Sequence, residues 1–151
     1  MTSTPQPFKP GPQALKPSGP QALKPSGALT ALVADDEQLA RDELCFQLGK
    51  IEGVEVVAQA ANGVEALEEI SRTTPDVAFL DIQMPGLTGF EVARKLLESG
   101  TSPSVIFVTA FDQRPIEVFE VNAVDYVLKP VDTVRLETAL SRPRKRKGEN
   151  E

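Results

Sequence analysis

The segment Val77–Gly89, VAFLDIQMPGLTG, decides the fold of this chain. Its first four residues form a short apolar run, which is typical of a strand buried on both faces in a parallel sheet. The run ends at Asp81, and a carboxylate directly after a core strand is costly to bury without partners. A Pro-Gly pair then predicts an irregular loop, and Thr88 with Glu91 is a capping-box pattern that opens a helix. Ligands bind at this edge of open α/β sheets, although Asp81 taken alone could simply cap a turn.

Four further segments with strand character alternate with helical patterns along the chain. They are Leu29–Ala34, Val54–Ala60, Ser104–Val108 and Asp125–Leu128. Five strands that alternate with five helices predict a doubly wound α/β fold, with a five-stranded parallel sheet and helices on both faces. Right-handed crossovers and a switch point inside the sheet favour the strand order 2-1-3-4-5.

The helices are predicted from apolar residues at helical spacing. The first carries Ala40, Leu44, Leu48 and Ile51, the second carries Val64, Leu67 and Ile70, and the third buries Phe90, Ala93, Leu96 and Leu97. The fourth is expected to start near Asp112 and Pro115 and carries Ile116, Phe119 and Val121. The last runs from Thr133 to about residue 140, because Pro143 is expected to terminate it.

Polar side chains follow the ends of four predicted strands. Asp35 and Asp36 follow the first strand, Asp81 the third, Thr109 the fourth and Lys129 the fifth. Because these strand ends are neighbours in the predicted order, we expect the side chains to converge on one pocket. Three carboxylates packed together raise one another's pKa unless cations intervene. An all-oxygen acidic cluster therefore predicts a site for a hard divalent ion such as Mg²⁺ or Mn²⁺.

The same residues have the chemistry to accept a phosphoryl group. Asp81 would be the nucleophile, while Lys129 and the Thr109 hydroxyl would each hold a phosphate oxygen beside the metal ion. Each residue alone could be a cap or a solvated charge. Their coincidence at four strand ends is what indicates a site.

The composition excludes several other kinds of site. Histidine is absent, which rules out a Ser-His-Asp triad, a histidine zinc site and a phosphohistidine within this chain. Cys45 is the only cysteine, so we expect a structural thiol rather than a disulfide or a thiolate metal site. No stretch reaches the roughly 18 apolar residues of a membrane span, and the N-terminus lacks the apolar core of a signal peptide. We therefore expect a soluble, cytoplasmic protein with no membrane partner.

The two ends of the chain differ in composition from its centre. Residues 1–28 hold seven of the 13 prolines and contain GPQALKPS twice, so we expect a disordered Pro-rich tail. Residues 142–151 begin with RPRKRK and are expected to be a basic tail or linker. Residues 29–141 carry eight basic and twenty acidic residues. So acidic a domain is not expected to bind nucleic acid on its own surface.

Over residues 29–141 the chain resembles the receiver domain of response regulators. The motifs that carry the resemblance are Asp35-Asp36-Glu37, DIQMPGLTG from Asp81, Thr109-Ala110 and Lys129-Pro130, in this order and at the family's spacings. The resemblance implies the flavodoxin-like receiver fold of two-component signalling. It also implies that Asp81 accepts phosphate from a sensor histidine kinase. Such a domain is a switch rather than an enzyme, since it catalyses only its own phosphorylation and dephosphorylation.

The resemblance also implies which residues bind the metal ion. Asp36 and Asp81 would be direct ligands together with the backbone carbonyl of Gln83, and Asp35 would contribute through a water molecule. Thr109 would sense the phosphate and Lys129 would bind it.

A change at the phosphate is implied to reach a distant surface through Tyr126, the expected aromatic switch. Output is expected at the face made by the fourth helix, the fifth strand and the fifth helix, with homodimerisation on phosphorylation. The Lys129–Pro130 bond is expected to be cis.

The segment Phe111–Pro130, FDQRPIEVFEVNAVDYVLKP, looks most like receivers of the LytTR class. Those receivers normally precede a C-terminal DNA-binding domain, which implies the regulatory domain of a LytTR-type transcription factor. No such domain lies within these 151 residues. Two alternatives therefore stay open: a stand-alone receiver, and a pseudo-receiver that binds partners without being phosphorylated.

Two other protein classes are disfavoured by the sequence. A haloacid-dehalogenase-type phosphatase also uses an aspartyl nucleophile, but it needs a second Asp two residues later, where this chain has Gln83. A nucleotide-binding fold is disfavoured because no GxGxxG or GxxxxGK[ST] follows any predicted strand. Turnover of a phosphate ester would separate the phosphatase from the switch.

Overall fold

The computed structural model describes residues 28–100, 103–113 and 115–150. Its strands are β1 (Leu29–Ala34), β2 (Val54–Ala60), β3 (Val77–Leu80), β4 (Ser104–Thr109) and β5 (Asp125–Leu128). They form one parallel sheet in the order β2-β1-β3-β4-β5, which confirms the predicted topology. The chain reverses its direction of travel across the sheet after β2, so the switch point lies between β1 and β3.

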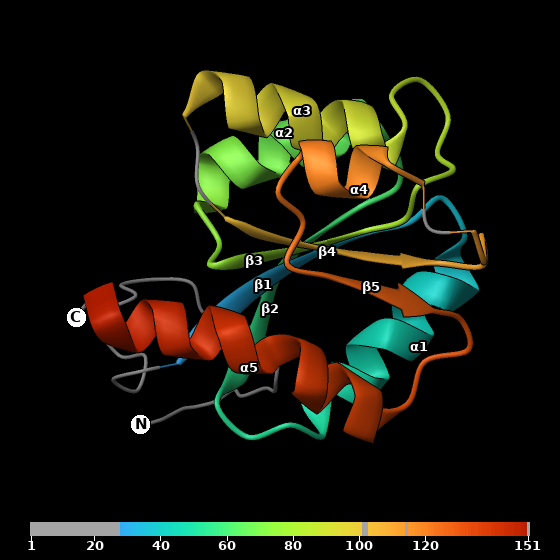
Figure 1. Ribbon diagram of the computed structural model, residues 1–151. Coiled ribbons are helices and arrows are strands. Elements are labelled where there is room, and N and C mark those ends of the chain that lie inside the picture. The colour runs from blue at the N-terminus through green and yellow to red at the C-terminus, as the bar shows by residue number, and fades with distance from the viewer. Residues whose placement is uncertain (1–27, 101–102, 114, 151) are drawn as a thin grey trace, which may run out of the picture.

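Helices cover both faces of the sheet (Figure 1). One face carries α1 (Gln38–Gly49) and α5 (Thr133–Asn150), and the other carries α2 (Gly63–Thr73), α3 (Gly89–Ser99) and α4 (Glu117–Glu120). Successive residues of β3 alternate between the two cores: Phe79 packs on the α1 and α5 side and Leu80 on the other. Both faces are therefore buried, which is why the strands are almost uninterrupted apolar runs.

Short polar signals and glycine begin and end the helices, and the predicted capping box at Thr88 is confirmed. Asn62 caps α2 by accepting a hydrogen bond from the backbone N–H of Glu65 at 2.8 Å. Thr88 and Glu91 form both halves of the capping box that opens α3. Gly100 ends α3 with a φ of 77°, a left-handed conformation that glycine adopts at little cost.

Several apolar helical residues that the sequence patterns favoured for the core lie at the surface instead. They are Val64, Leu97, Ile116 and Phe119. The fourth helix also begins later than predicted, at Glu117, and has four residues. In so short a helix one i, i+3 pair, Val118 and Val121, is enough to cover the sheet, and both side chains are buried. Ile116 and Phe119 are consequently left facing outward.

The last helix is longer than predicted, because it continues through Pro143 to Asn150. A proline inside a helix removes one backbone hydrogen bond and costs about 3 kcal/mol, so the prediction ended the helix before it. Pro143 is buried in the folded domain, and cationic side chains beyond it contact backbone and side-chain oxygens of other elements. These tertiary contacts outweigh the local preference.

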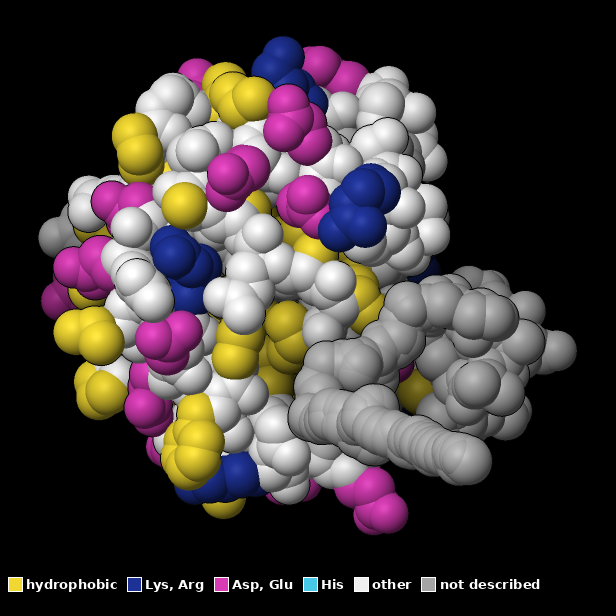
Figure 2. Space-filling view, turned by 180° about the vertical axis from the view of Figure 1, so that it is seen from behind, with side chains coloured by type: hydrophobic (Ala, Val, Ile, Leu, Met, Phe, Trp, Pro, Cys, Tyr) yellow, Lys and Arg dark blue, Asp and Glu magenta, His cyan; other side chains and the backbone are white. Residues whose placement is uncertain are grey.

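The described surface carries mixed charge. Seen from the back of the molecule, Lys and Arg side chains stand singly among Asp and Glu (Figure 2). No helix of the described part of the chain is long and apolar enough to cross a membrane. The predicted Pro-rich tail lies outside the described residues, apart from Ala28.

Candidate functional site

Four side chains from different strand ends meet at the carboxyl edge of the sheet. Asp35, Asp81 and Thr109 are 4%, 7% and 1% exposed. The Lys129 ammonium donates to Asp35 Oδ2 at 2.6 Å and to Asp81 Oδ2 at 3.2 Å. One ammonium thus bridges two buried carboxylates, which could not lie this close without a cation between them. The predicted convergence of these strand ends is confirmed.

The backbone of the sheet positions these side chains. The N–H groups of Asp35, Asp81 and Lys129 donate to carbonyl groups on neighbouring strands at 3.1, 2.9 and 2.9 Å. The hydrogen-bond ladder therefore extends one residue beyond β1, β3 and β5. Because these bonds belong to the sheet, the relative positions of the three side chains are fixed by the fold.

A third carboxylate completes an acidic cluster. Oxygen atoms of Asp35, Asp36 and Asp81 all lie within 4.8 Å of one another, and Asp36 is the exposed member. Three carboxylates that can converge in this way are the oxygen donors that Mg²⁺ and Mn²⁺ prefer. The donor set therefore fits a hard divalent cation. Gln83, whose carbonyl was expected to contribute, follows Asp81 by two residues and has an exposed side chain.

The close packing of these groups shifts the pKa values of Asp81 and Lys129. Burial raises the pKa of Asp81, and the negative charge of Asp35 raises it further, while Lys129 and a hydrogen bond with Thr109 only partly offset the rise. Burial alone would lower the pKa of Lys129, but its hydrogen bond to Asp35 and the charge of Asp81 raise it overall. The ammonium thus stays charged, and the Asp81 carboxylate gains from any further cation beside it.

Two further residues support the site in ways that were not predicted from the sequence. The Arg41 guanidinium donates to the backbone carbonyl of Asp35 at 2.7 Å, which fixes the start of the loop that carries the acids. Gly89 lies directly against Asp81: a Cβ at this position would be 2.3 Å from the Asp81 carbonyl oxygen. The signal in the sequence for this close contact was the glycine itself, because most residue types are tolerated at the first helical position after the Thr88 cap.

The expected switch residues are joined through the loop after β4. Tyr126 is 3% exposed, and its hydroxyl donates to the Phe111 carbonyl at 2.6 Å. The Phe111 N–H in turn donates to the Thr109 hydroxyl oxygen at 3.3 Å. Thr109 and Tyr126 therefore contact the same short segment. The expected cis bond between Lys129 and Pro130 is present.

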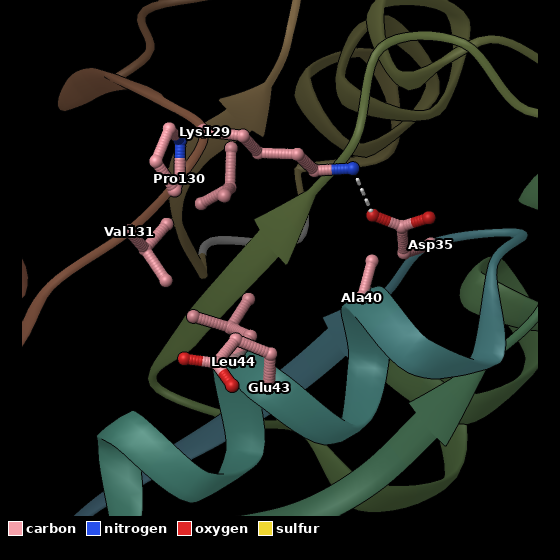
Figure 3. A pocket seen from close by; sticks show the side chains of 8 residues that line it. Asp35, Ala40, Glu43, Leu44, Lys129, Pro130 and Val131 are labelled. Atoms are coloured by element: carbon pink, nitrogen blue, oxygen red, sulfur yellow. Dashed lines mark hydrogen bonds and ion pairs between the residues drawn. The ribbon is translucent and has the colours of Figure 1, made fainter.

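A cavity of about 350 Å³ opens beside the cluster, between α1 and the segment that follows β5 (Figure 3). Ala40, Leu44, Val108, Pro130 and Val131 supply apolar wall, and Asp35, Glu43 and Lys129 supply the charged lining. A mostly apolar hollow beside reactive polar groups is a typical binding site.

The chain matches a known family over most of its length. Residues 31–141 match the response regulator receiver domain. The chain belongs to the response-regulator receiver family. Receivers are phosphoacceptor modules of two-component signalling that work with histidine kinases, and they do not turn over a separate substrate. The three-carboxylate cluster of this receiver is typical of the Mg²⁺ site of the family.

Named relatives share this receiver and extend beyond it. A response regulatory protein of Vibrio cholerae is 49% identical over 114 residues, which are 76% of this chain and 48% of the relative. The sensory transduction protein LytT of Bacillus cereus is 44% identical over 119 residues, 79% of this chain and 48% of LytT. The chain therefore spans about half the length of these relatives.

Solved receivers have the same architecture. The response regulatory domain of mrkE from Klebsiella pneumoniae is 28% identical and superposes with a TM-score of 0.72, covering 80% of this chain and 99% of that domain. The receiver domain of NarL from Mycobacterium tuberculosis is 30% identical with the same TM-score, covering 78% of this chain and 96% of that domain. The flavodoxin-like receiver fold predicted from the sequence is confirmed.

Proposed function

We propose that this receiver is phosphorylated on Asp81 by a sensor histidine kinase and that the phosphate switches a surface for output. The observation that carries the proposal is the placement of Asp81. Its carboxylate is buried, lies 3.2 Å from the Lys129 ammonium and belongs to a three-carboxylate cluster. Such a carboxylate is a nucleophile that already has a phosphate-binding cation beside it.

In the proposed transfer, an Asp81 carboxylate oxygen bonds to phosphorus as the P–N bond of the kinase's phosphohistidine breaks. The electron pair of that bond stays on the imidazole nitrogen, which takes up a proton. Lys129 and Thr109 each bind one oxygen of the phosphoryl group. Asp36, Asp81 and the Gln83 carbonyl would hold Mg²⁺ directly and Asp35 through water; the bound ion supplies charge neutralisation for the phosphoryl oxygens.

The donor must reach this site from outside, and the cavity beside Lys129 provides a place for it. Its apolar walls on α1 and after β5 suit apolar side chains of the kinase, while Glu43 and Lys129 supply charged groups at the same place. We therefore assign this cavity to kinase docking. Lys129 would then contact both the phosphoryl group and the kinase that donates it.

We further propose that the whole regulator is a LytTR-type transcription factor. The support is the 44% identity with LytT and the fact that this chain spans about half of that protein. DNA would then be bound by a separate domain, because the central 113 residues of this chain are strongly acidic.

The test of phosphoacceptance uses acetyl phosphate as donor. With Mg²⁺ present, the chain is expected to take up one phosphate, and hydroxylamine is expected to release it, because hydroxylamine cleaves acyl phosphates and leaves phosphate esters intact. A hydroxylamine-resistant phosphate would place the group on Ser, Thr or Tyr and contradict the proposal. No uptake from acetyl phosphate or from any histidine kinase would favour a pseudo-receiver.

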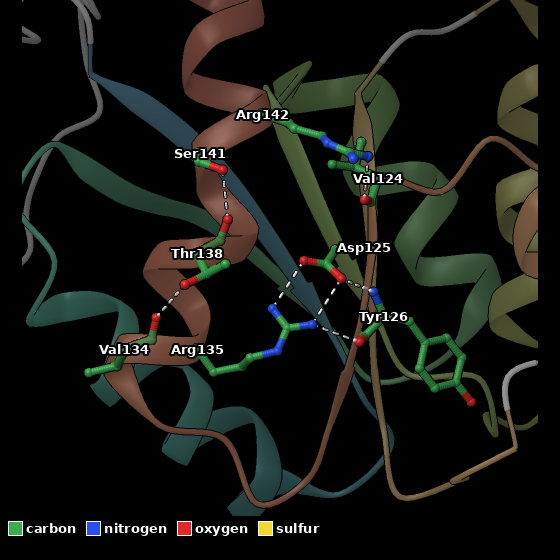
Figure 4. Close-up of polar contacts among 8 residues, drawn as sticks. All are labelled: Val124, Asp125, Tyr126, Val134, Arg135, Thr138, Ser141 and Arg142. Carbon is green, nitrogen blue, oxygen red and sulfur yellow. Dashed lines mark hydrogen bonds and ion pairs between the residues drawn. The ribbon is translucent and has the colours of Figure 1, made fainter.

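The output surface is proposed at α4, β5 and α5. Ile116, just before α4, and Phe119 on α4 are each 69% exposed, which leaves an apolar patch without cover among the described residues. The edge of β5 is less available, because Arg135 donates to Asp125 Oδ2 at 3.0 Å and to the Tyr126 carbonyl at 3.0 Å (Figure 4). A partner is therefore expected to contact α4 side chains rather than extend the sheet.

Phosphorylation is expected to convert the monomer to a homodimer through this patch. Light scattering coupled to gel filtration, before and after treatment with acetyl phosphate and Mg²⁺, would measure the change. Replacing Phe119 by Glu should keep the phosphorylated form monomeric without reducing phosphate uptake, because Phe119 lies outside the acidic site. An unchanged mass at high concentration after phosphorylation would count against the dimer.

A further inference from the structure

The basic residues at the end of α5 contact the edge of the sheet opposite the phosphoacceptor. Four of their side chains donate hydrogen bonds there: Arg142 to the Val124 carbonyl at 3.4 Å, Arg144 to the Glu52 carbonyl at 2.8 Å, Arg146 to Ser104 Oγ at 3.2 Å, and Lys147 to Asp76 Oδ2 at 2.9 Å. Figure 1 shows α5 crossing one face of the sheet, with its C-terminal end on the side where the strands begin, and Figure 4 shows the contact of Arg142. We call residues 142–147 the basic clamp.

Asp76 is the best-connected of these acceptors. Its Oδ2 atom accepts from the Thr30 N–H at 2.9 Å, from the Thr30 hydroxyl at 3.0 Å and from Lys147. Its own backbone carbonyl accepts from the Ser104 N–H at 2.9 Å. Asp76 thus joins the starts of β1, β3 and β4 to α5. Burial opposes its charged form, but the hydrogen bonds from Thr30 and Lys147 outweigh burial and hold its pKa below the ordinary value.

The helical state of the clamp depends on these contacts. Pro143 lies within the helix and weakens it, and like charges face each other at i, i+4 between Arg142 and Arg146 and at i, i+3 between Arg144 and Lys147. An isolated helix with these features would not be stable in water. The burial of Pro143 and the four donated hydrogen bonds offset these destabilising features. The helical order of this segment therefore comes from its contacts with the sheet edge.

We propose that the basic clamp is an intramolecular ligand of the N-terminal edge of the sheet, and that Asp76 is the residue that holds it. The surface consists of the starts of β2, β3, β4 and β5, and its partner is the chain's own cationic helix end. The proposal goes beyond phosphoacceptance and does not depend on it. Its consequence is that four of the five cations of the clamp, all but Lys145, are hydrogen-bonded to the receiver and are less available to polyanions such as nucleic acid.

The experiment compares hydrogen exchange of residues 142–148 in the full chain and in Asp76→Asn, by mass spectrometry. Asparagine keeps an oxygen that accepts from Thr30 but loses the charge that binds Lys147. The clamp peptide is expected to be protected in the parent and to exchange about five- to tenfold faster in Asp76→Asn, with little change in β3. Limited trypsin cleavage after Arg144, Lys145 or Arg146 should accelerate to a similar extent.

Two further variants keep the outcome decisive. Lys147→Gln removes the other partner of the same ion pair from a surface helix, so it should reproduce the faster exchange even if Asp76→Asn folds poorly, and the double variant should add little. Glu98→Gln is the control: it changes an exposed acid on α3 whose side chain has no hydrogen bond or ion pair to another described residue, so it should change nothing. Exchange of the parent clamp at the rate of an unfolded peptide, or equal rates in all variants, would overturn the proposal. Binding of duplex DNA by the parent with unchanged clamp protection would overturn it as well.

Discussion

Replacing Asp36 by Ala is expected to slow phosphate uptake from acetyl phosphate by at least about 100-fold, and excess EDTA should do the same to the parent. The reason is charge: two buried carboxylates, Asp35 and Asp81, share one ammonium, and a phosphoryl group cannot approach them without a further cation. Asp36 is exposed and makes no hydrogen bond or ion pair with another described residue, so its loss should leave stability unchanged. The measurement is the time course of phosphorylation at saturating Mg²⁺.

The matched control for Asp36→Ala is Asp42→Ala, which removes an exposed acid from α1 outside the acidic cluster. It should phosphorylate at the parent rate. Normal uptake by Asp36→Ala, or normal uptake by the parent in EDTA, would show that the acidic cluster accepts phosphate without a divalent ion. The proposed metal site would then be wrong.

Gly89→Ala is expected to lower the free energy of unfolding by about 3 kcal/mol, among the largest effects of any single methyl group in this chain. The added Cβ would lie 2.3 Å from the Asp81 carbonyl oxygen and 3.0 Å from the Ile82 Cα. Both contacts are with backbone, which cannot swing aside as a flexible side chain can. Relief therefore requires that α3 or the loop after β3 moves, and this should also reduce phosphate uptake. Urea unfolding measures the stability change.

Gly49→Ala makes the same chemical change without a clash, since no described heavy atom beyond the neighbouring residues and the backbone of α1 lies within 4 Å of a Cβ at residue 49. Residue 49 is the last of α1, and the substitution should stabilise the protein by about 0.5–1 kcal/mol or leave it unchanged. If both glycine variants behaved alike, the contact of Gly89 with the Asp81 backbone would not matter to the fold.

The strands could be predicted from the sequence because each is a local apolar run. Val77–Leu80 is buried on both faces, so it has no polar position to obscure the pattern. The convergence of Asp35, Asp81, Thr109 and Lys129 then followed from topology alone, because parallel strands place their carboxyl ends at one edge. The Thr88 capping box was predictable for the same local reason.

The remaining features depend on residues far apart in the sequence. Two contacts help to order the helix beyond Pro143. Arg144 contacts Glu52, which lies 92 residues earlier, and Lys147 contacts Asp76, which lies 71 residues earlier. Local helix propensity predicts that the helix ends before Pro143, but tertiary packing outweighs this preference. The role of Gly89 is set by the distance between two backbones, and the outward position of Ile116 by the shortness of α4. None of these three features can be predicted from a local sequence pattern.

The intact mass of the chain after incubation with acetyl phosphate and Mg²⁺ tests the central claim most directly. The account predicts one added phosphate on the parent and none on Asp81→Asn, which keeps the shape of the side chain but removes the nucleophilic carboxylate. A circular dichroism spectrum would confirm that the variant is folded. Equal phosphorylation of the two proteins, or a folded parent that takes up no phosphate with Mg²⁺ present, would contradict the assignment of Asp81 as the phosphoacceptor.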